Sequence, residues 1–156
     1  MKKLFLLFFV FYSIGVFAND DEYVFIGTDT KNTMSMYLNN IIRKNDDIKS
    51  TYYIWIKIVY IGDGISESIE YLKLMKECGK SVKNEYNFSY SISLCLINPM
   101  SYKLKHISEN FYDKDDNAIF YSKDKESEED WSIIKPNTMY DSFIKKAYLI
   151  ISLIKK

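Results

Sequence analysis

The chain has 156 residues, with 21 Lys and Arg against 21 Asp and Glu, so its formal net charge is zero. This balance argues against nucleic acid as a partner, which requires a basic surface. With 5 Gly, 2 Pro and no repeat or low-complexity linker, the chain is predicted to fold as one compact domain.

The first 18 residues are typical of a secretory signal peptide. A pair of lysines precedes the apolar run Leu4–Tyr12, and Val16-Phe17-Ala18 resembles a cleavage site. The run is shorter than the roughly 20 residues that span a bilayer, and no later stretch reaches that length without a charge. We therefore expect export through the inner membrane, to the periplasm or the outer cell surface. The mature domain, residues 19–156, would keep 19 basic and 21 acidic residues, a net charge of −2, and no transmembrane segment.

The mature chain begins with a predicted β-hairpin. Glu22–Thr28 and Thr33–Leu38 have strand composition, and the turn-forming residues Asp29–Asn32 separate them. Ile41-Ile42 is predicted as a short edge piece, followed by a charged loop from Arg43 to Lys49.

Thr51–Ile61 is the strongest predicted strand. Both of its faces are largely apolar, which indicates a central strand covered on both sides, with Ile54 and Trp55 in the core. Gly62–Gly64 ends this strand. A short helix is predicted over Ser66–Cys78, with Gly79 as its C-cap. The apolar side of that helix is expected to carry Tyr71, Leu74, Met75 and Cys78.

Tyr86–Ile97 alternates in polarity, which predicts a half-buried antiparallel strand. Tyr and aliphatic residues occupy one face, whereas Ser89, Ser91 and Ser93 occupy the other. Tyr102–Tyr112 and Ala118–Tyr121 would complete a three-strand meander. The serine face of Tyr86–Ile97 contains no nearby base, so Ser89, Ser91 and Ser93 are not predicted to act as nucleophiles.

The longest helix is predicted at the C-terminal end. Thr138 can cap it together with Asp141, and an apolar stripe recurs at helical spacing. The stripe consists of Met139, Phe143, Ala147, Ile150 and Ile154. We predict that this helix covers the sheet; a membrane-binding helix is the alternative. The predicted fold class is α+β: an antiparallel β-sheet of about six strands packed against a C-terminal α-helix, with a short helix inserted before the central hairpin.

Two cysteines are present, and export makes a disulfide between Cys78 and Cys95 a candidate. Two buried free thiols are the alternative.

Several short motifs follow one another along the chain: Tyr23–Asp29, Tyr53–Lys57, Cys95 followed by Tyr102, Tyr112-Asp113 with the turn before Ile119, and Trp131, Ile134 and Pro136 before the helix. Their order resembles that of the surface-adhesin protein E-like family of Gram-negative bacteria. The resemblance implies an antiparallel sheet against a C-terminal helix and an adhesin-like activity toward matrix or serum proteins. It transfers no binding residue.

The chain departs from this family at two points. Asn117 stands where the family usually has Gly, and Asn can still adopt a left-handed conformation. The family commonly pairs its strand cysteine with one late in the C-terminal helix, which has no Cys here. Any bridge would therefore join Cys95 to Cys78 on the inserted helix.

Candidates for catalysis and metal binding are weak. Asp113, Asp115, Asn117 and Asp124 are spaced like an oxygen-rich calcium loop, but Ala118 stands where that loop needs Gly. A solvated hairpin turn is favoured instead. The single histidine, His106, lacks the companions that a metal site needs. The carboxylate run of Glu126, Glu128, Glu129 and Asp130 is predicted to be a solvated loop rather than a glycosidase acid and base.

The 14 tyrosines favour a binding function, because Tyr buries area at interfaces and keeps a polar group. We predict a non-catalytic protein without a cofactor that contacts host or matrix proteins through its sheet, with a homodimer as a further assembly. The alternative is a periplasmic structural or accessory protein that binds an envelope component. Tyr37, Tyr112 and Tyr121 are expected to lie outside the core.

Overall fold

A computed structural model describes residues 23–43, 51–123 and 131–154. The predicted signal peptide, most of the predicted loop from Arg43 to Lys49, and the carboxylate run ending at Asp130 lie outside these ranges.

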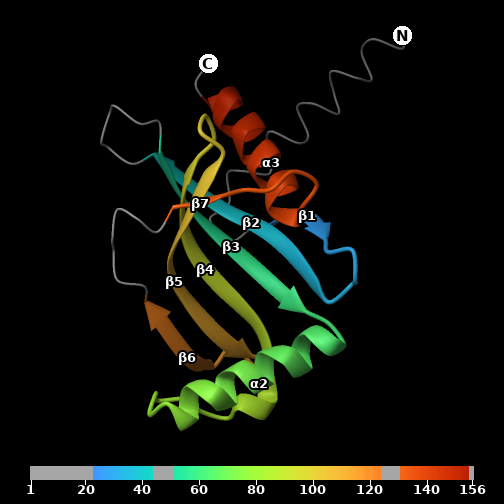
Figure 1. The fold of residues 1–156 in the computed structure, drawn as a ribbon, viewed down its shortest axis with the longest axis vertical. Coiled ribbons are helices and arrows are strands. Elements are labelled where there is room, and N and C mark those ends of the chain that lie inside the picture. The colour runs from blue at the N-terminus through green and yellow to red at the C-terminus, as the bar shows by residue number, and fades with distance from the viewer. Residues whose placement is uncertain (1–22, 44–50, 124–130, 155–156) are drawn as a thin grey trace.

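The fold is α+β, as predicted: a curled antiparallel sheet with helices packed on it (Figure 1). Its strands follow one another in chain order, so every sheet neighbour is also a sequence neighbour. The strands are β1 (Val24–Thr28), β2 (Met34–Arg43), β3 (Tyr52–Tyr60), β4 (Phe88–Asn98), β5 (Lys103–Asp113) and β6 (Ala118–Lys123), and β7 (Ser132–Ile133) pairs with β5. The helices are α2 (Asp63–Glu77), the short 3-10 helix η2 (Glu85–Asn87) and α3 (Met139–Ile154).

The predicted hairpin of β1 and β2 is confirmed, and Asp29 holds its turn. The Asp29 carboxylate accepts hydrogen bonds from the Thr33 and Met34 amides at 2.6 and 2.9 Å and from the Thr33 hydroxyl at 2.8 Å. These bonds favour the charged carboxylate, so the pKa of Asp29 is lowered. The two pieces predicted on either side of residue 40 are one strand, because an irregularity in register between Leu38 and Ile41 lets β2 continue along β3.

The larger hydrophobic core lies between α3 and the inner face of β1 to β4. Phe143, Ile144 and Ala147 of α3 are fully buried, and they pack against Ile54 and Ile56 of β3, among others. α3 therefore covers the inner face of the sheet, as its apolar stripe predicted.

A second core lies under α2 at the other end of the sheet. Leu72 of α2 is fully buried against Phe88, Phe111 and Phe120. The helix itself was predicted, and Gly79 follows its end with the left-handed φ of a C-cap. Of the residues predicted along its apolar side, Met75 packs against this core, whereas Tyr71, Leu74 and Cys78 are exposed and Leu72 is the anchor.

Both cores lie on the same face of the sheet. Cross-strand partners in an antiparallel sheet share a face, and the register pairs Ile58 with Ser91, Ser91 with Phe111, and Phe111 with Phe120. This row runs from the α3 core into the α2 core. We call this side the inner face and the opposite side the outer face.

The prediction that β3 is covered on both sides is wrong. Residues at even positions from Tyr52 to Ile58 are buried on the inner face, whereas Tyr53, Trp55 and Lys57 on the outer face are half-buried. Trp55 is thus not a core residue of the helix-covered side. Both helices that the structure describes pack on the inner face.

β4 is oriented opposite to what its polarity suggests. Its polar residues point inward, with Ser91 and Ser93 buried together with Cys95, whereas Ile92 and Leu94 lie half-buried on the outer face. The start of β4 also differs from the prediction, since a 3-10 turn occupies residues 85–87. An irregularity after Phe88 reverses the alternation there and turns its ring into the α2 core.

The predicted bridge between Cys78 and Cys95 does not form; both cysteines are free. Cys95 is buried under α3, whereas Cys78 is exposed at the end of α2. An ion pair between Lys76 and Glu85 holds this end of α2 near the start of β4. At about 3.3 Å per residue, Cys95 lies roughly 20 Å along the strand from that point. A disulfide needs Cα atoms within about 7 Å.

The start of α3 is fixed by the predicted capping pair and by three additional hydrogen bonds. The Asp141 amide donates to the Thr138 hydroxyl at 3.2 Å, and the buried Asp141 carboxylate accepts a hydrogen bond from the Tyr102 hydroxyl. It also accepts from the Asn137 amide at 2.8 Å and the Lys145 ammonium at 2.9 Å. These donors, Tyr102 first, lower the pKa of Asp141 to about 2.

Replacement of Phe143 by Ala should remove a buried ring from the larger core. We expect a loss of about 3–5 kcal/mol in the free energy of unfolding, and a melting temperature lower by on the order of 10 °C. The control is Tyr148→Ala on the same helix, because Tyr148 is 51% exposed. Equal melting temperatures for the two variants would contradict the packing of α3.

Acid should weaken the start of α3 through Asp141. Because its pKa is depressed in the folded chain, its contribution to stability is present above the unfolded value near 4 and disappears as the pH falls toward 2. Thermal melts of Asp141→Asn should therefore differ most from the wild type at pH 5–7. The difference should shrink between pH 5 and pH 2. A constant difference across that range would disprove the role of this carboxylate.

Candidate functional site

The residues predicted as a weak calcium loop form a hairpin turn between β5 and β6. The Asp113 carboxylate accepts hydrogen bonds from the Asp115 and Asn117 amides at 2.9 and 2.8 Å, and these bonds lower its pKa. Asp116, not Asn117, adopts the left-handed conformation, with φ 63°. Asp124 lies outside the described residues, among which the structure brings together no metal-binding group of His, Cys, Asp or Glu.

The outer face of the sheet carries a continuous row of side chains that spans all six strands. The row is read directly from the printed register, since each residue is the cross-strand partner of the next. From β1 to β6 it consists of Phe25, Tyr37, Lys57, Ile92, Asn110 and Tyr121. We call this set the outer row. Its two ends are the most accessible, with Phe25 50% and Tyr121 55% exposed.

A second set of aromatic side chains adjoins the outer row. Tyr90 stacks on Tyr112 with ring centroids 5.0 Å apart, and the Lys57 ammonium lies 4.0 Å from the centre of the Tyr90 ring. The Tyr90 hydroxyl donates to the Asp116 carboxylate at 2.6 Å. Burial and this acidic partner raise the pKa of Tyr90. Tyr90 therefore remains a neutral ring that holds Lys57 in place at the middle of the face.

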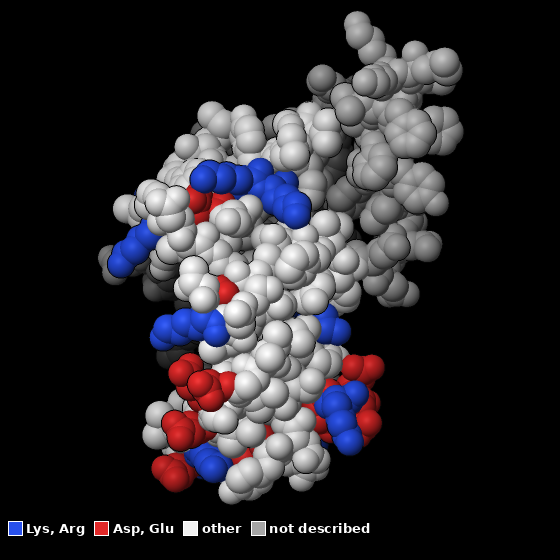
Figure 2. Space-filling model, turned by 90° about the vertical axis from the view of Figure 1, so that its right-hand side faces the viewer, with Lys and Arg blue, Asp and Glu red and all other residues white. Residues whose placement is uncertain are grey.

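The other side of the outer row is aliphatic and aromatic. Trp55 and Leu94 are cross-strand partners on β3 and β4, and both are half-buried. With Tyr37 and Phe25, whose ring centroids are 5.4 Å apart, they extend the apolar area toward the β1 edge. Seen from the side on which β1 and β2 lie in Figure 1, basic side chains gather in the upper part and charges of both signs in the lower part, and isolated charges lie in the mostly uncharged surface between them (Figure 2).

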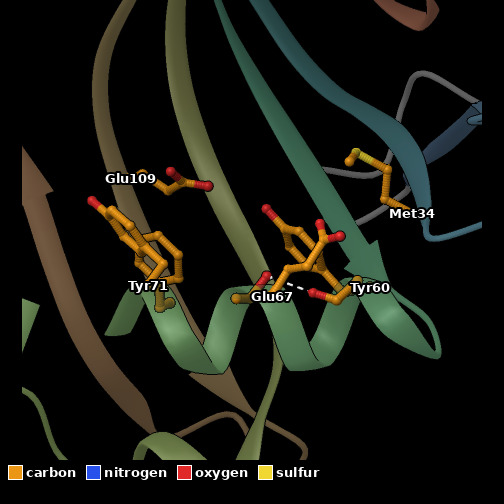
Figure 3. A pocket seen from close by; sticks show the side chains of 8 residues that line it. Met34, Tyr60, Glu67, Tyr71 and Glu109 are labelled. Carbon is orange, nitrogen blue, oxygen red and sulfur yellow. Dashed lines mark hydrogen bonds between the residues drawn. The ribbon is translucent and has the colours of Figure 1, made fainter. Parts of the chain in front are cut away.

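A pocket of about 220 Å³ opens on the inner face, between α2 and the sheet. Side chains from three elements converge on it in Figure 3: Tyr60 from β3, Glu67 and Tyr71 from α2, and Glu109 from β5. Phe111 completes the wall and contacts Tyr71 at a centroid distance of 5.9 Å. The pocket therefore combines three aromatic rings with two carboxylates.

Electrostatics in this region favour neutral phenols. Burial and the nearby Glu109 carboxylate raise the pKa of Tyr60 to about 12, and its hydroxyl lies 3.4 Å from that of Ser91. The pKa of Tyr140 at the start of α3 is also raised, by partial burial of its hydroxyl group and by Cys95, Tyr60 and Glu109, although 40% of the residue's surface is exposed. Both phenols thus keep their protons at physiological pH and can donate hydrogen bonds.

Gly64 fixes the position of α2 over the pocket. A Cβ at this position would lie 2.2 Å from the carbonyl oxygen of Thr33, so α2 approaches the turn between β1 and β2 as closely as its backbone permits. The Ile61 amide donates to the same carbonyl at 2.8 Å. The wall that carries Glu67 and Tyr71 is therefore held by backbone contacts at its N-terminal end.

The structure separates the residues that the sequence singled out. Tyr37, Tyr112 and Tyr121 lie on the outer face, as expected for tyrosines outside the core. His106 and Ser91 belong to the inner side, where the His106 ring nitrogen is 3.8 Å from a Glu109 carboxylate oxygen. The pocket residues were not predicted, because Tyr60, Glu67 and Glu109 come from separate elements and share no sequence motif.

Comparisons with family models, curated proteins and solved structures find no match for this chain. Neither helix in the described ranges is long and apolar enough to cross a membrane. Fold and surfaces together define the protein as an α+β domain whose sheet has one helix-covered face and one aromatic face on which neither α2 nor α3 packs. The resemblance to the surface-adhesin protein E-like family stays a prediction.

Proposed function

We propose that the protein is an exported, non-catalytic binding module that contacts another protein through its outer sheet face, in the manner of an adhesin. The outer row carries this proposal. It places Tyr37 and Tyr121 on one surface with Phe25, and Trp55 lies beside it. Tyr and Trp are the side chains most enriched among the residues that dominate the energy of protein interfaces.

The extent of this face suits a protein partner better than a small molecule. Six strands at about 4.8 Å spacing and roughly seven residues along each strand correspond to an area on the order of 600 Å². Stable protein interfaces bury about 800 Å² on each partner, and transient ones bury less. The sheet is also rigid, which limits the conformational entropy lost on binding.

Charge indicates the chemistry of the partner surface. Lys57 lies in the middle of the outer row with its ammonium over the Tyr90 ring, and its neighbours across the strands, Tyr37 and Ile92, are uncharged. A partner that places a carboxylate against Lys57 and apolar side chains around it would complement this face. We propose host or extracellular-matrix proteins as the source of that surface; an envelope component would make the protein a periplasmic accessory factor instead.

The double variant Tyr37→Ser/Tyr121→Ser should lose binding. Truncation of aromatic residues that dominate an interface commonly costs 2 kcal/mol or more, which corresponds to a dissociation constant raised by roughly 30-fold. We would measure saturable binding of the purified protein, without its signal peptide, to immobilised extracellular-matrix glycoproteins and, separately, to purified envelope fractions. The first arm tests the adhesin proposal, and the second tests the accessory alternative.

The matched control is Tyr148→Ser, which removes a similarly exposed tyrosine from α3. Tyr121→Ser alone serves as a second test variant if the double variant lowers the melting temperature. Binding that is weakened equally by the control, or left unchanged by both outer-face variants, would contradict this use of the sheet. Self-association that disappears in the double variant would instead identify the outer face as a homodimer interface.

A further inference from the structure

We propose that the pocket under α2 is a second binding site, separate from the outer face, that takes a positively charged organic group such as an alkylammonium or a guanidinium. The proposal rests on three observations about the pocket: its carboxylates, its aromatic walls and its size.

The two carboxylates enter the pocket from opposite walls. Glu67 projects from α2 and Glu109 from β5, and Figure 3 shows both carboxylates directed toward the space beside Tyr60. The ion-pair partner of Glu109 in the described part of the chain is His106 at 3.8 Å, which is beyond hydrogen-bonding distance. The Glu109 carboxylate therefore keeps oxygen lone pairs that can accept N–H groups from a ligand.

The aromatic rings favour the same ligand. Tyr60, Tyr71 and Phe111 line the pocket, and the negative face of an aromatic ring attracts an organic cation. A hydrated metal ion would not use these walls, whereas an alkylammonium places its methylene groups against the rings and its charge near the carboxylates. The neutral Tyr60 phenol, which also lines the pocket, adds a hydroxyl group that can form a hydrogen bond.

The size limits the ligand to a small group. A volume of about 220 Å³ is below the range of roughly 300–1,000 Å³ typical of pockets for drug-sized molecules. The rim is accessible, because Tyr71 is 40% exposed and Glu67 is also exposed. Such a pocket can receive a free amine, or the end of a Lys or Arg side chain that projects from a protein.

The test is a titration of the purified, isotope-labelled protein followed by amide chemical shifts. The probes are n-butylammonium for a free amine and the N-acetyl methylamides of Lys and Arg for protein side chains, with the norleucine analogue as a neutral isostere. We expect dissociation constants on the order of millimolar for the cations. Shifts should centre on residues 60, 67, 71 and 109, and the amides of outer-row residues distant from the pocket, Phe25 and Lys57, should not move.

Two variants test the carboxylates. Glu109→Gln should weaken binding roughly tenfold, because a charge-assisted hydrogen bond is lost in a partly buried site. Glu67→Gln should weaken it roughly threefold, since its carboxylate is exposed. Glu70→Gln is the matched control, because it lies on the same exposed helix outside the pocket lining and should leave binding unchanged.

Preference for the free amine over the Lys and Arg derivatives would identify a small-molecule site, and the reverse preference would identify a side-chain site. The proposal is overturned if the norleucine analogue binds as tightly as the Lys derivative. It is also overturned if none of the cations shifts the pocket amides, or if neither Glu67→Gln nor Glu109→Gln weakens binding. Glu67→Gln keeps the test valid if Glu109→Gln fails to fold, because an exposed carboxylate on α2 contributes little to stability.

Discussion

Packing of both described helices on one face of a single sheet is the constraint on which the rest of this structure depends. β3 carries apolar side chains on both faces and β4 turns Ser91 and Ser93 inward, yet both helices pack on the inner face, anchored by Phe143 and Leu72. Burial of apolar area stabilises a fold by about 25 cal/mol per Å², so most of the hydrophobic stabilisation comes from the face that the helices cover. On the outer face Tyr90 and Leu96 are buried, but Trp55 and Leu94 remain half-exposed and Phe25 and Tyr121 are exposed; partly exposed apolar surfaces of this kind are typical of interaction sites.

The two helices cover different ends of the inner face. α3 covers one end and α2 the other, and Tyr60 contacts both cores. The floor between them is built from small side chains, because Ser91 and Ser93 point inward from β4. Small residues leave room for the phenol of Tyr60. The same arrangement brings Glu109 close to that phenol, so the inverted polarity of β4 and the position of the pocket have one structural origin.

The fold class, the hairpin of β1 and β2, the inserted helix and the covering helix α3 could all be predicted from periodicity and capping residues. The choice of covered face could not, because a period-2 pattern separates two faces without stating which one meets a helix when both are apolar. The irregularity after Phe88 also changes the phase of β4 without any Gly or Pro to mark it. The pocket residues escaped prediction because they meet only where α2 packs beside β3 and β5. The cysteine pairing failed because sequence separation contains no information on which ends of the sheet the two thiols occupy.

The central claim is that the outer face is open in the folded protein, and hydroxyl-radical footprinting with mass spectrometry tests it most directly. At dilute protein concentration, the account predicts strong modification of Phe25, Trp55 and Tyr121 and protection of Phe143 and Met36, which are fully buried. Denatured protein supplies the reference reactivity of each residue. Protection of the outer-face aromatics equal to that of Phe143 would contradict the account, because it would mean that the outer face is covered as completely as the inner one.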